Sequence, residues 1–153
     1  MRFLTIVLTM LVFVCSSCDK DETVYMTDSY VWLKSETGLS HIIVKSDVKN
    51  INTYNIVLSA AQQKENLTVN YEILVGNGLQ QGVDFEMVTE GNSLTLLPGI
   101  FDMPIRIKWL PHKVDPSKDN TLTIRLTGNS KNYCIGMPGP DHLNSSIKIE
   151  KQN

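Results

Sequence analysis

The chain alternates most regularly over Thr68-Val69-Asn70-Tyr71-Glu72-Ile73-Leu74-Val75. Apolar or aromatic residues take the odd-numbered positions, and three of the four even-numbered positions are polar. Successive side chains of a β-strand point to opposite sides of a sheet, whereas a helix repeats its apolar residues every three or four positions. The stretch therefore predicts a β-strand with one buried face and one solvated face.

The same alternation recurs on both sides of this stretch, in short runs separated by Gly, Pro, Asn and Asp. The other expected strands cover residues 24–33, 41–44, 54–60, 85–89, 93–97, 103–109, 121–127 and 147–149. The runs 85–89 and 93–97 flank Glu90-Gly91-Asn92, which predicts a hairpin turn between them. After residue 23, no stretch keeps a helical period with capping residues.

These patterns predict an all-β fold, an antiparallel immunoglobulin-like β-sandwich formed by residues 24–153 as one domain. Two sheets that each have one apolar face can bury those faces against each other. A closed barrel would satisfy the same patterns and stays open as the alternative.

The phase of the alternation also predicts which side chains form the core. Ile124 lies in the apolar phase of its strand, and Trp109 shares a phase with Ile105 and Ile107, so all of these are expected inside. Cys134 is expected to be a small buried side chain, because it stands between an aromatic and an aliphatic residue.

The chain starts with a pattern typical of secretion. Arg2 precedes a nearly uninterrupted apolar run over residues 3–14, which is too short to span a membrane. Ser16-Ser17-Cys18 follows, and this order resembles the lipobox of bacterial lipoproteins. The resemblance implies a lipoprotein signal peptide over residues 1–17 and acylation of Cys18. An ordinary secretory signal cut near Ser17, with Cys18 left free, is the alternative.

Residues 18–23 are predicted to be an acidic, solvated tether that begins at the lipidated cysteine, because Asp19-Lys20-Asp21-Glu22 contains no apolar side chain. This charged run also resembles the surface-export signal of Bacteroidota-type lipoproteins. The resemblance implies a lipid-anchored protein of the outer membrane that faces the cell exterior, with Asp19, Lys20, Asp21 and Glu22 as the export signal. The periplasmic face is the alternative location.

Composition and motifs argue against several classes of function. The net charge of −2 disfavours a nucleic-acid partner. The histidines at 41, 112 and 142 lack zinc-ligand spacing, and no nucleophile-elbow motif is present. We therefore predict no catalytic residue, no metal and no cofactor.

Residues 66–150 resemble the Calx-beta-like domains of Bacteroidota surface lipoproteins. The resemblance rests on Leu67-Thr68-Val69-Asn70-Tyr71-Glu72 as a leading strand, Gly82-Val83-Asp84-Phe85 as a Gly-x-Asp-aromatic step, Leu94-Thr95-Leu96-Leu97-Pro98-Gly99 as a strand ending in a turn, and Asn132-Tyr133-Cys134-Ile135-Gly136 as a late corner. It implies a Calx-beta-like sandwich.

The calcium-binding members of that family place carboxylate clusters at strand ends. The corresponding positions here are Trp109-Leu110-Pro111 and Glu150-Lys151-Gln152. Calcium takes six to eight oxygen ligands, and Asp84, Asp115 and Asp119 are few for that number. A solvated loop is therefore the expectation, and a weak calcium site is the alternative.

Tyr30 and Trp32 share one face of the first expected strand and are the candidate ligand-binding residues. The functional hypothesis is a non-catalytic, lipid-anchored binding or adhesion module of the cell surface, with a glycan or a protein as ligand. The alternative is a structural or accessory subunit of an outer-membrane or periplasmic complex.

Overall fold

A computed structural model describes residues 28–153. The expected signal peptide (1–17), Cys18, Asp19, Lys20, Asp21, Glu22 and the rest of the tether lie outside the described residues. Within the described part, ten β-strands follow one another: β1 (Tyr30–Ser35), β2 (His41–Lys45), β3 (Asn50–Ser59), β4 (Leu67–Val75), β5 (Phe85–Met87), β6 (Ser93–Leu96), β7 (Asp102–Trp109), β8 (Thr121–Asn129), β9 (Cys134–Ile135) and β10 (Ser146–Gln152). No helix long and apolar enough to cross a membrane occurs among these residues.

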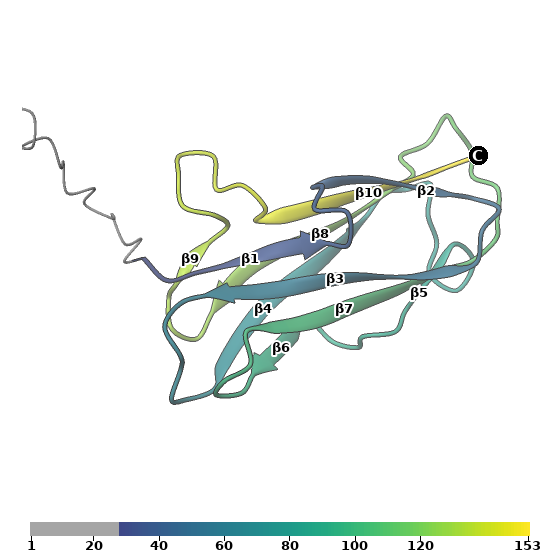
Figure 1. Cartoon of the computed structure of the whole chain (residues 1–153). Helices are drawn as coiled ribbons and strands as arrows, with labels where there is room; N and C mark the ends of the chain where they lie inside the picture. Colours follow the sequence, from purple (N-terminus) through teal and green to yellow (C-terminus); the bar gives the residue numbers. More distant parts are fainter. Residues whose placement is uncertain (1–27) are drawn as a thin grey trace, which may run out of the picture.

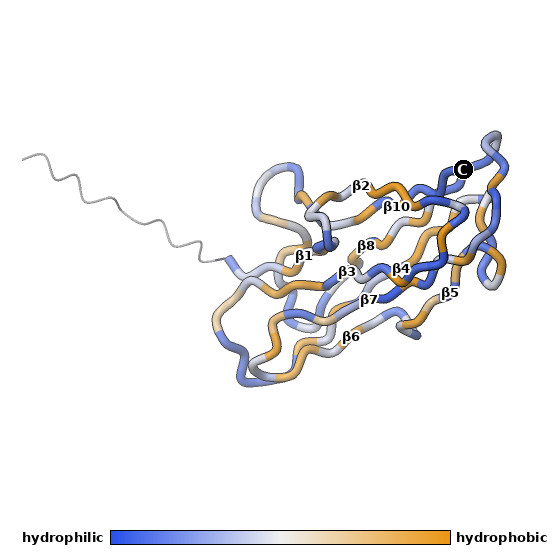
Figure 2. The backbone as a smooth tube through the Cα atoms, turned by 45° about the vertical axis from the view of Figure 1, so that its right-hand side comes forward, coloured by the Kyte–Doolittle hydropathy of each residue, from blue (hydrophilic) through white to orange (hydrophobic). Residues whose placement is uncertain are grey.

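The strands form two five-stranded sheets that pack face to face (Figure 1). The first sheet has the order β5-β7-β3-β1-β9, and the second has the order β2-β10-β8-β4-β6. The predicted β-sandwich is confirmed, and the two sheets stay separate instead of closing into one barrel. Hydrophilic and hydrophobic segments alternate along the strands (Figure 2), as a two-layer fold with one buried face per sheet requires.

Most strand pairs are antiparallel as predicted, but two pairs at sheet edges are parallel. β9 pairs with β1, and β2 pairs with β10, in the parallel sense. Antiparallel neighbours can be joined by a short hairpin, whereas parallel neighbours need a longer connection. In both of these pairs the partners are far apart in the sequence, so no hairpin fixes their direction.

The hairpin predicted around Glu90-Gly91-Asn92 is wrong. β5 pairs with β7 in the first sheet, and β6 pairs with β4 in the second, so the three residues carry the chain from one sheet to the other. Gly91 adopts a positive φ of 83° at this crossing. The Tyr71 N–H donates to the Asn92 carbonyl at 2.9 Å, which holds the crossing against β4. Alternation marks strands but does not say which sheet a strand joins.

The core between the sheets contains the residues that the alternation predicts. Trp109, Ile105, Ile107 and Ile124 are fully buried. The Phe85 and Trp109 rings lie 6.0 Å apart between centroids in a tilted arrangement. The predicted phases of β7 and β8 are therefore confirmed.

Cys134 is exposed, which corrects the prediction of a buried thiol. It lies in β9, a strand of only two residues at the edge of the first sheet. A two-residue strand has too few positions for alternation to define its inner face, so neighbouring aromatic and aliphatic residues gave no reliable signal.

Candidate functional site

The first candidate site is the outer face of the first sheet around Tyr30 and Trp32, here called the aromatic face. In β1, Val31 and Leu33 are fully buried. Because side chains alternate along a strand, Tyr30 and Trp32 point to the opposite side, away from the core. Both are half-buried. The structure therefore brings the two predicted ligand-binding residues together on one solvent-facing surface.

Strands β3 and β9 lie on either side of these rings, and β3 fixes the orientation of the Trp32 indole. Trp32 lies opposite Val57 of β3, and Tyr30 lies opposite Ser59. The Trp32 Nε1–H donates a hydrogen bond to the Ser59 Oγ at 3.1 Å. On the other side, Tyr30 is in register with Cys134 of β9. The indole is thus anchored at its polar edge, and ring orientation needs little further ordering when a ligand binds.

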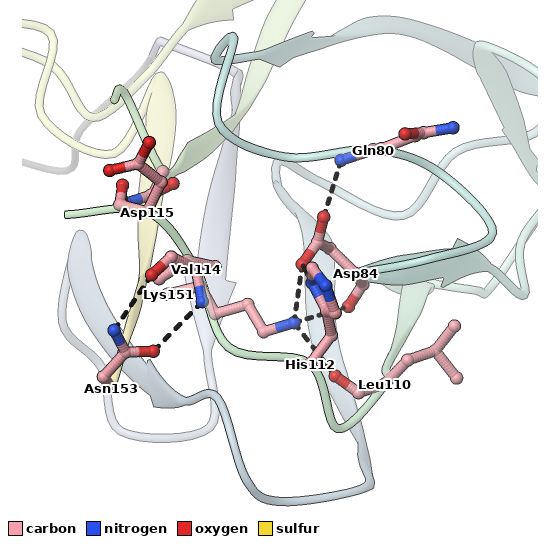
Figure 3. A network of polar contacts seen from close by, with 9 residues as sticks. Gln80, Asp84, Leu110, His112, Val114, Asp115, Lys151 and Asn153 are labelled. Atoms are coloured by element: carbon pink, nitrogen blue, oxygen red, sulfur yellow. Dashed lines mark hydrogen bonds and ion pairs between the residues drawn. The ribbon is translucent and has the colours of Figure 1, made fainter. Parts of the chain in front are cut away.

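The second candidate site is a buried polar cluster at the end of the sandwich where the C-terminus lies (Figures 1 and 3). Asp84 precedes β5, and Lys151 belongs to β10. Both side chains are almost completely buried, and the Lys151 Nζ lies 3.0 Å from the Asp84 Oδ1. The ammonium also donates to the Leu110 carbonyl at 2.9 Å and to the Asp84 carbonyl at 3.3 Å. All three donors of the lysine therefore have acceptors, as a buried charge requires.

Two further groups hold the Asp84 carboxylate. The His112 Nδ1 lies 2.9 Å from Oδ1, and the Gln80 N–H donates to Oδ2 at 2.9 Å. Burial by itself raises the pKa of Asp84, but hydrogen bonds from His112, Lys151 and the Gln80 N–H, together with the Lys151 charge, outweigh burial and lower that pKa below its ordinary value. The carboxylate is therefore charged at neutral pH and bound on both oxygens.

Comparison with known proteins bears on the fold. No family model matches the sequence, and no curated protein matches it. The crystal structure of CBD12 from CALX1.2 matches with a TM-score of 0.54 and 19% sequence identity. This chain has a Calx-beta-like β-sandwich fold. The match covers 78% of this chain and 42% of that one, so the chain spans less than half of the length of the structure it resembles.

The residues of this Calx-beta-like sandwich do not fit a calcium ion at the strand ends that the family resemblance implies. The Lys151 ammonium lies against Asp84 there, and a positive charge in that position repels a second cation. Asp115 Oδ1 accepts hydrogen bonds from Ser117, and Asp119 Oδ1 accepts from Thr121, so both carboxylates serve their own loop. Among the described residues, no group of three or more His, Cys, Asp or Glu side chains is placed to hold a metal ion.

The sequence reasoning missed the burial of Lys151 and its pairing with Asp84. A signal was available in β10, where Ile147 and Ile149 are buried and Lys151 is the next residue in the same phase. Continuing the alternation by one step places the lysine inside. A buried ammonium needs a buried counter-charge, but no local pattern in the sequence singles out Asp84 as that partner.

Proposed function

We propose that this chain is a non-catalytic binding module, lipid-anchored at the outer membrane and displayed on the cell surface, and that its aromatic face binds glycans. The observation that carries the glycan assignment is the half-buried Trp32 indole, held by Ser59 on the outer side of a sheet. A sugar ring has an apolar C–H face that packs on an aromatic ring, and its hydroxyl groups need polar partners at the ring's edge.

The surroundings of Trp32 supply such polar partners. Lys34 is the next residue of β1 on the same side, and it lies opposite Asn55 of β3. An ammonium, an amide and a hydroxyl group therefore lie on the same face of the sheet as the two rings, and the hydroxyl group of Ser59 contacts the indole. Ligand sites usually combine aromatic side chains, which pack against the ligand, with a few polar side chains, which fix its orientation.

The test is a glycan array probed with the full chain in detergent, followed by titration of any hit. Intrinsic fluorescence reports directly on the site, because the chain has two tryptophans and Trp109 is fully buried. We expect a ligand-induced shift in emission that disappears in Trp32→Phe, and a loss of affinity of about tenfold or more in Trp32→Ala. The control is Thr123→Ala, on the outer face of the second sheet. Binding that survives Trp32→Ala would remove the aromatic face from the proposal.

The lipid anchor is tested at Cys18. Two small serines and an apolar segment precede this cysteine, which is the arrangement that supports acylation. Metabolic labelling with a fatty-acid probe is expected to mark the wild-type protein and to miss Cys18→Ala. Equal labelling of the two would contradict the anchor.

A further inference from the structure

The residues of β4, β5 and the segment after β5 line an open groove. It lies on the side of the sandwich where β5 and β6 form the sheet edges (Figure 1). Its volume is about 470 Å³. Ile73, Val75, Phe85 and Met87 form the apolar part of its lining, and the polar part comes from Gln81, Thr89, Glu90 and Asn92. Val75 belongs to the core-facing phase of β4 but is 44% exposed, because the facing sheet does not cover it.

Among residues 28–153, no strand lies beside the part of the β4 edge that borders this groove. β6 pairs with β4 only from Leu67 to Asn70, and the Tyr71 N–H donates to Asn92 where β6 begins. The Gly76 N–H donates to the Thr121 carbonyl of β8. At this end of β4, the backbone N–H and C=O groups of even-numbered residues therefore point toward β8. The backbone N–H and C=O groups of Ile73 and Val75 therefore point to the opposite side. Within residues 28–153 no strand pairs with them there.

We propose that this edge takes up an extended segment of a partner protein, which adds a strand beside Ile73 and Val75 and inserts an apolar side chain into the groove. An unpaired strand edge supplies the backbone hydrogen bonds of such an interface, and pockets for alternate side chains supply its selectivity. The inference is independent of the aromatic face, because the groove and that face lie on different surfaces of the sandwich.

The charge of Glu90 indicates which kind of partner segment fits the groove. Among the described residues that line the groove, Glu90 alone is ionisable, and its carboxylate makes no ion pair within residues 28–153. A partner segment that carries lysine or arginine beside its apolar residues would complement this charge. A second copy of the chain would bring another unpaired Glu90 to the same edge, which disfavours self-pairing. The expected partner is therefore a basic segment with alternating apolar residues.

The test uses two labelled peptides of about seven residues, in which valine alternates with threonine and the ends are either lysine or glutamate. Fluorescence anisotropy with the full chain in detergent measures binding. We expect the lysine-ended peptide to bind more tightly, and Glu90→Lys to reverse the preference. Val75→Pro removes one outward N–H that the fold does not use, so it is expected to weaken binding of the lysine-ended peptide by about tenfold or more. Leu74→Ser, which keeps every backbone N–H, is the matched control.

Each outcome is decisive. Loss of binding in Val75→Pro with retention in Leu74→Ser supports strand addition, and a thermal melt of each variant shows whether it is folded. If Val75→Pro unfolds, the reversed preference of Glu90→Lys supports the site on its own. The proposal is overturned if millimolar lysine-ended peptide does not bind, if Glu90→Lys leaves the preference unchanged, or if sedimentation shows a dimer that Val75→Pro abolishes. The last result would make a second copy the occupant.

Discussion

The buried Asp84 carboxylate is contacted by the Lys151 ammonium, the His112 ring and the Gln80 N–H. Of these three, Lys151 needs the carboxylate most. The Lys151 side chain has no exposed surface, so it cannot regain water if its counter-charge is removed. We predict that Asp84→Asn destabilises the fold by about 3–5 kcal/mol, because it leaves an uncompensated ammonium inside. The double variant Asp84→Asn with Lys151→Met is expected to recover part of that loss. Urea denaturation measures both.

The partly exposed pair of Lys108 and Glu86 provides the comparison. These side chains are 2.6 Å apart but lie at the surface, so Lys108→Met is expected to cost less than about 1 kcal/mol. If Lys108→Met and Asp84→Asn cost the same, burial is not what makes the Asp84 pair important.

The lowered pKa of Asp84 makes stability depend on pH in a defined direction. The folded state holds the carboxylate in its charged form more strongly than the unfolded chain does. The stabilisation is therefore complete above the unfolded pKa of about 3.9, and it is lost as the pH falls through the lower pKa of the folded state. We predict that denaturation series from neutral to acidic pH show a steeper loss for the wild type than for Asp84→Asn. Parallel curves for the two proteins would contradict this prediction.

The strand phases can be tested within one element, β8. Ile124 is fully buried and Thr123, its neighbour in the chain, lies on the outer face. Ile124→Ala is expected to lower the free energy of unfolding by about 2–5 kcal/mol, because it removes packed methyl and methylene groups from the core. Thr123→Ala removes only partly exposed atoms and is expected to cost much less. Equal costs in denaturant melts would mean that the phase is assigned to the wrong face.

Most of the strands, and which face of them is buried, could be predicted from the sequence. Alternation located most strands and gave the inner face of β7 and β8, because period-two patterning is a direct consequence of strand geometry. It did not assign β5 and β6 to different sheets, because pairing partners are set by long-range packing and not by local pattern. It also failed for Val75, whose phase is correct but whose position lies beyond the covering sheet.

The candidate sites also differ in how far they could be predicted from the sequence. Tyr30 and Trp32 could be placed on one face from their spacing of two residues alone. The Asp84–Lys151 pair joins residues that are 67 positions apart, so only the folded chain brings them together. The groove beside β4 depends on where β6 stops pairing, and no local motif in the sequence marks that end.

Across the whole molecule, the three features occupy separate regions: the aromatic face on one sheet, the ion pair at one end, and the groove at one edge. Their separation means that the proposed ligand site and the proposed partner site can be altered one at a time. Trp32 is half-buried and bonded to Ser59, so Trp32→Ala is expected to cost about 1 kcal/mol, as a typical single substitution does, and to leave the chain folded. This makes variants at one feature suitable controls for the others.

The side of the membrane that the molecule faces can be tested on intact cells. Lipid attachment at Cys18 is compatible with both the periplasm and the cell exterior, and the run Asp19-Lys20-Asp21-Glu22 is the sequence feature that favours the exterior. We predict that protease added to intact cells removes the protein while a periplasmic control protein survives. Replacing Asp21 and Glu22 with Ala is expected to retain fatty-acid labelling but move the protein into the protected pool. The matched control changes Lys20 to Ala, which makes the run more acidic and is expected to leave exposure unchanged. Protection of the wild type from protease would place the module in the periplasm. Exposure that persists without Asp21 and Glu22 would assign its export to another segment.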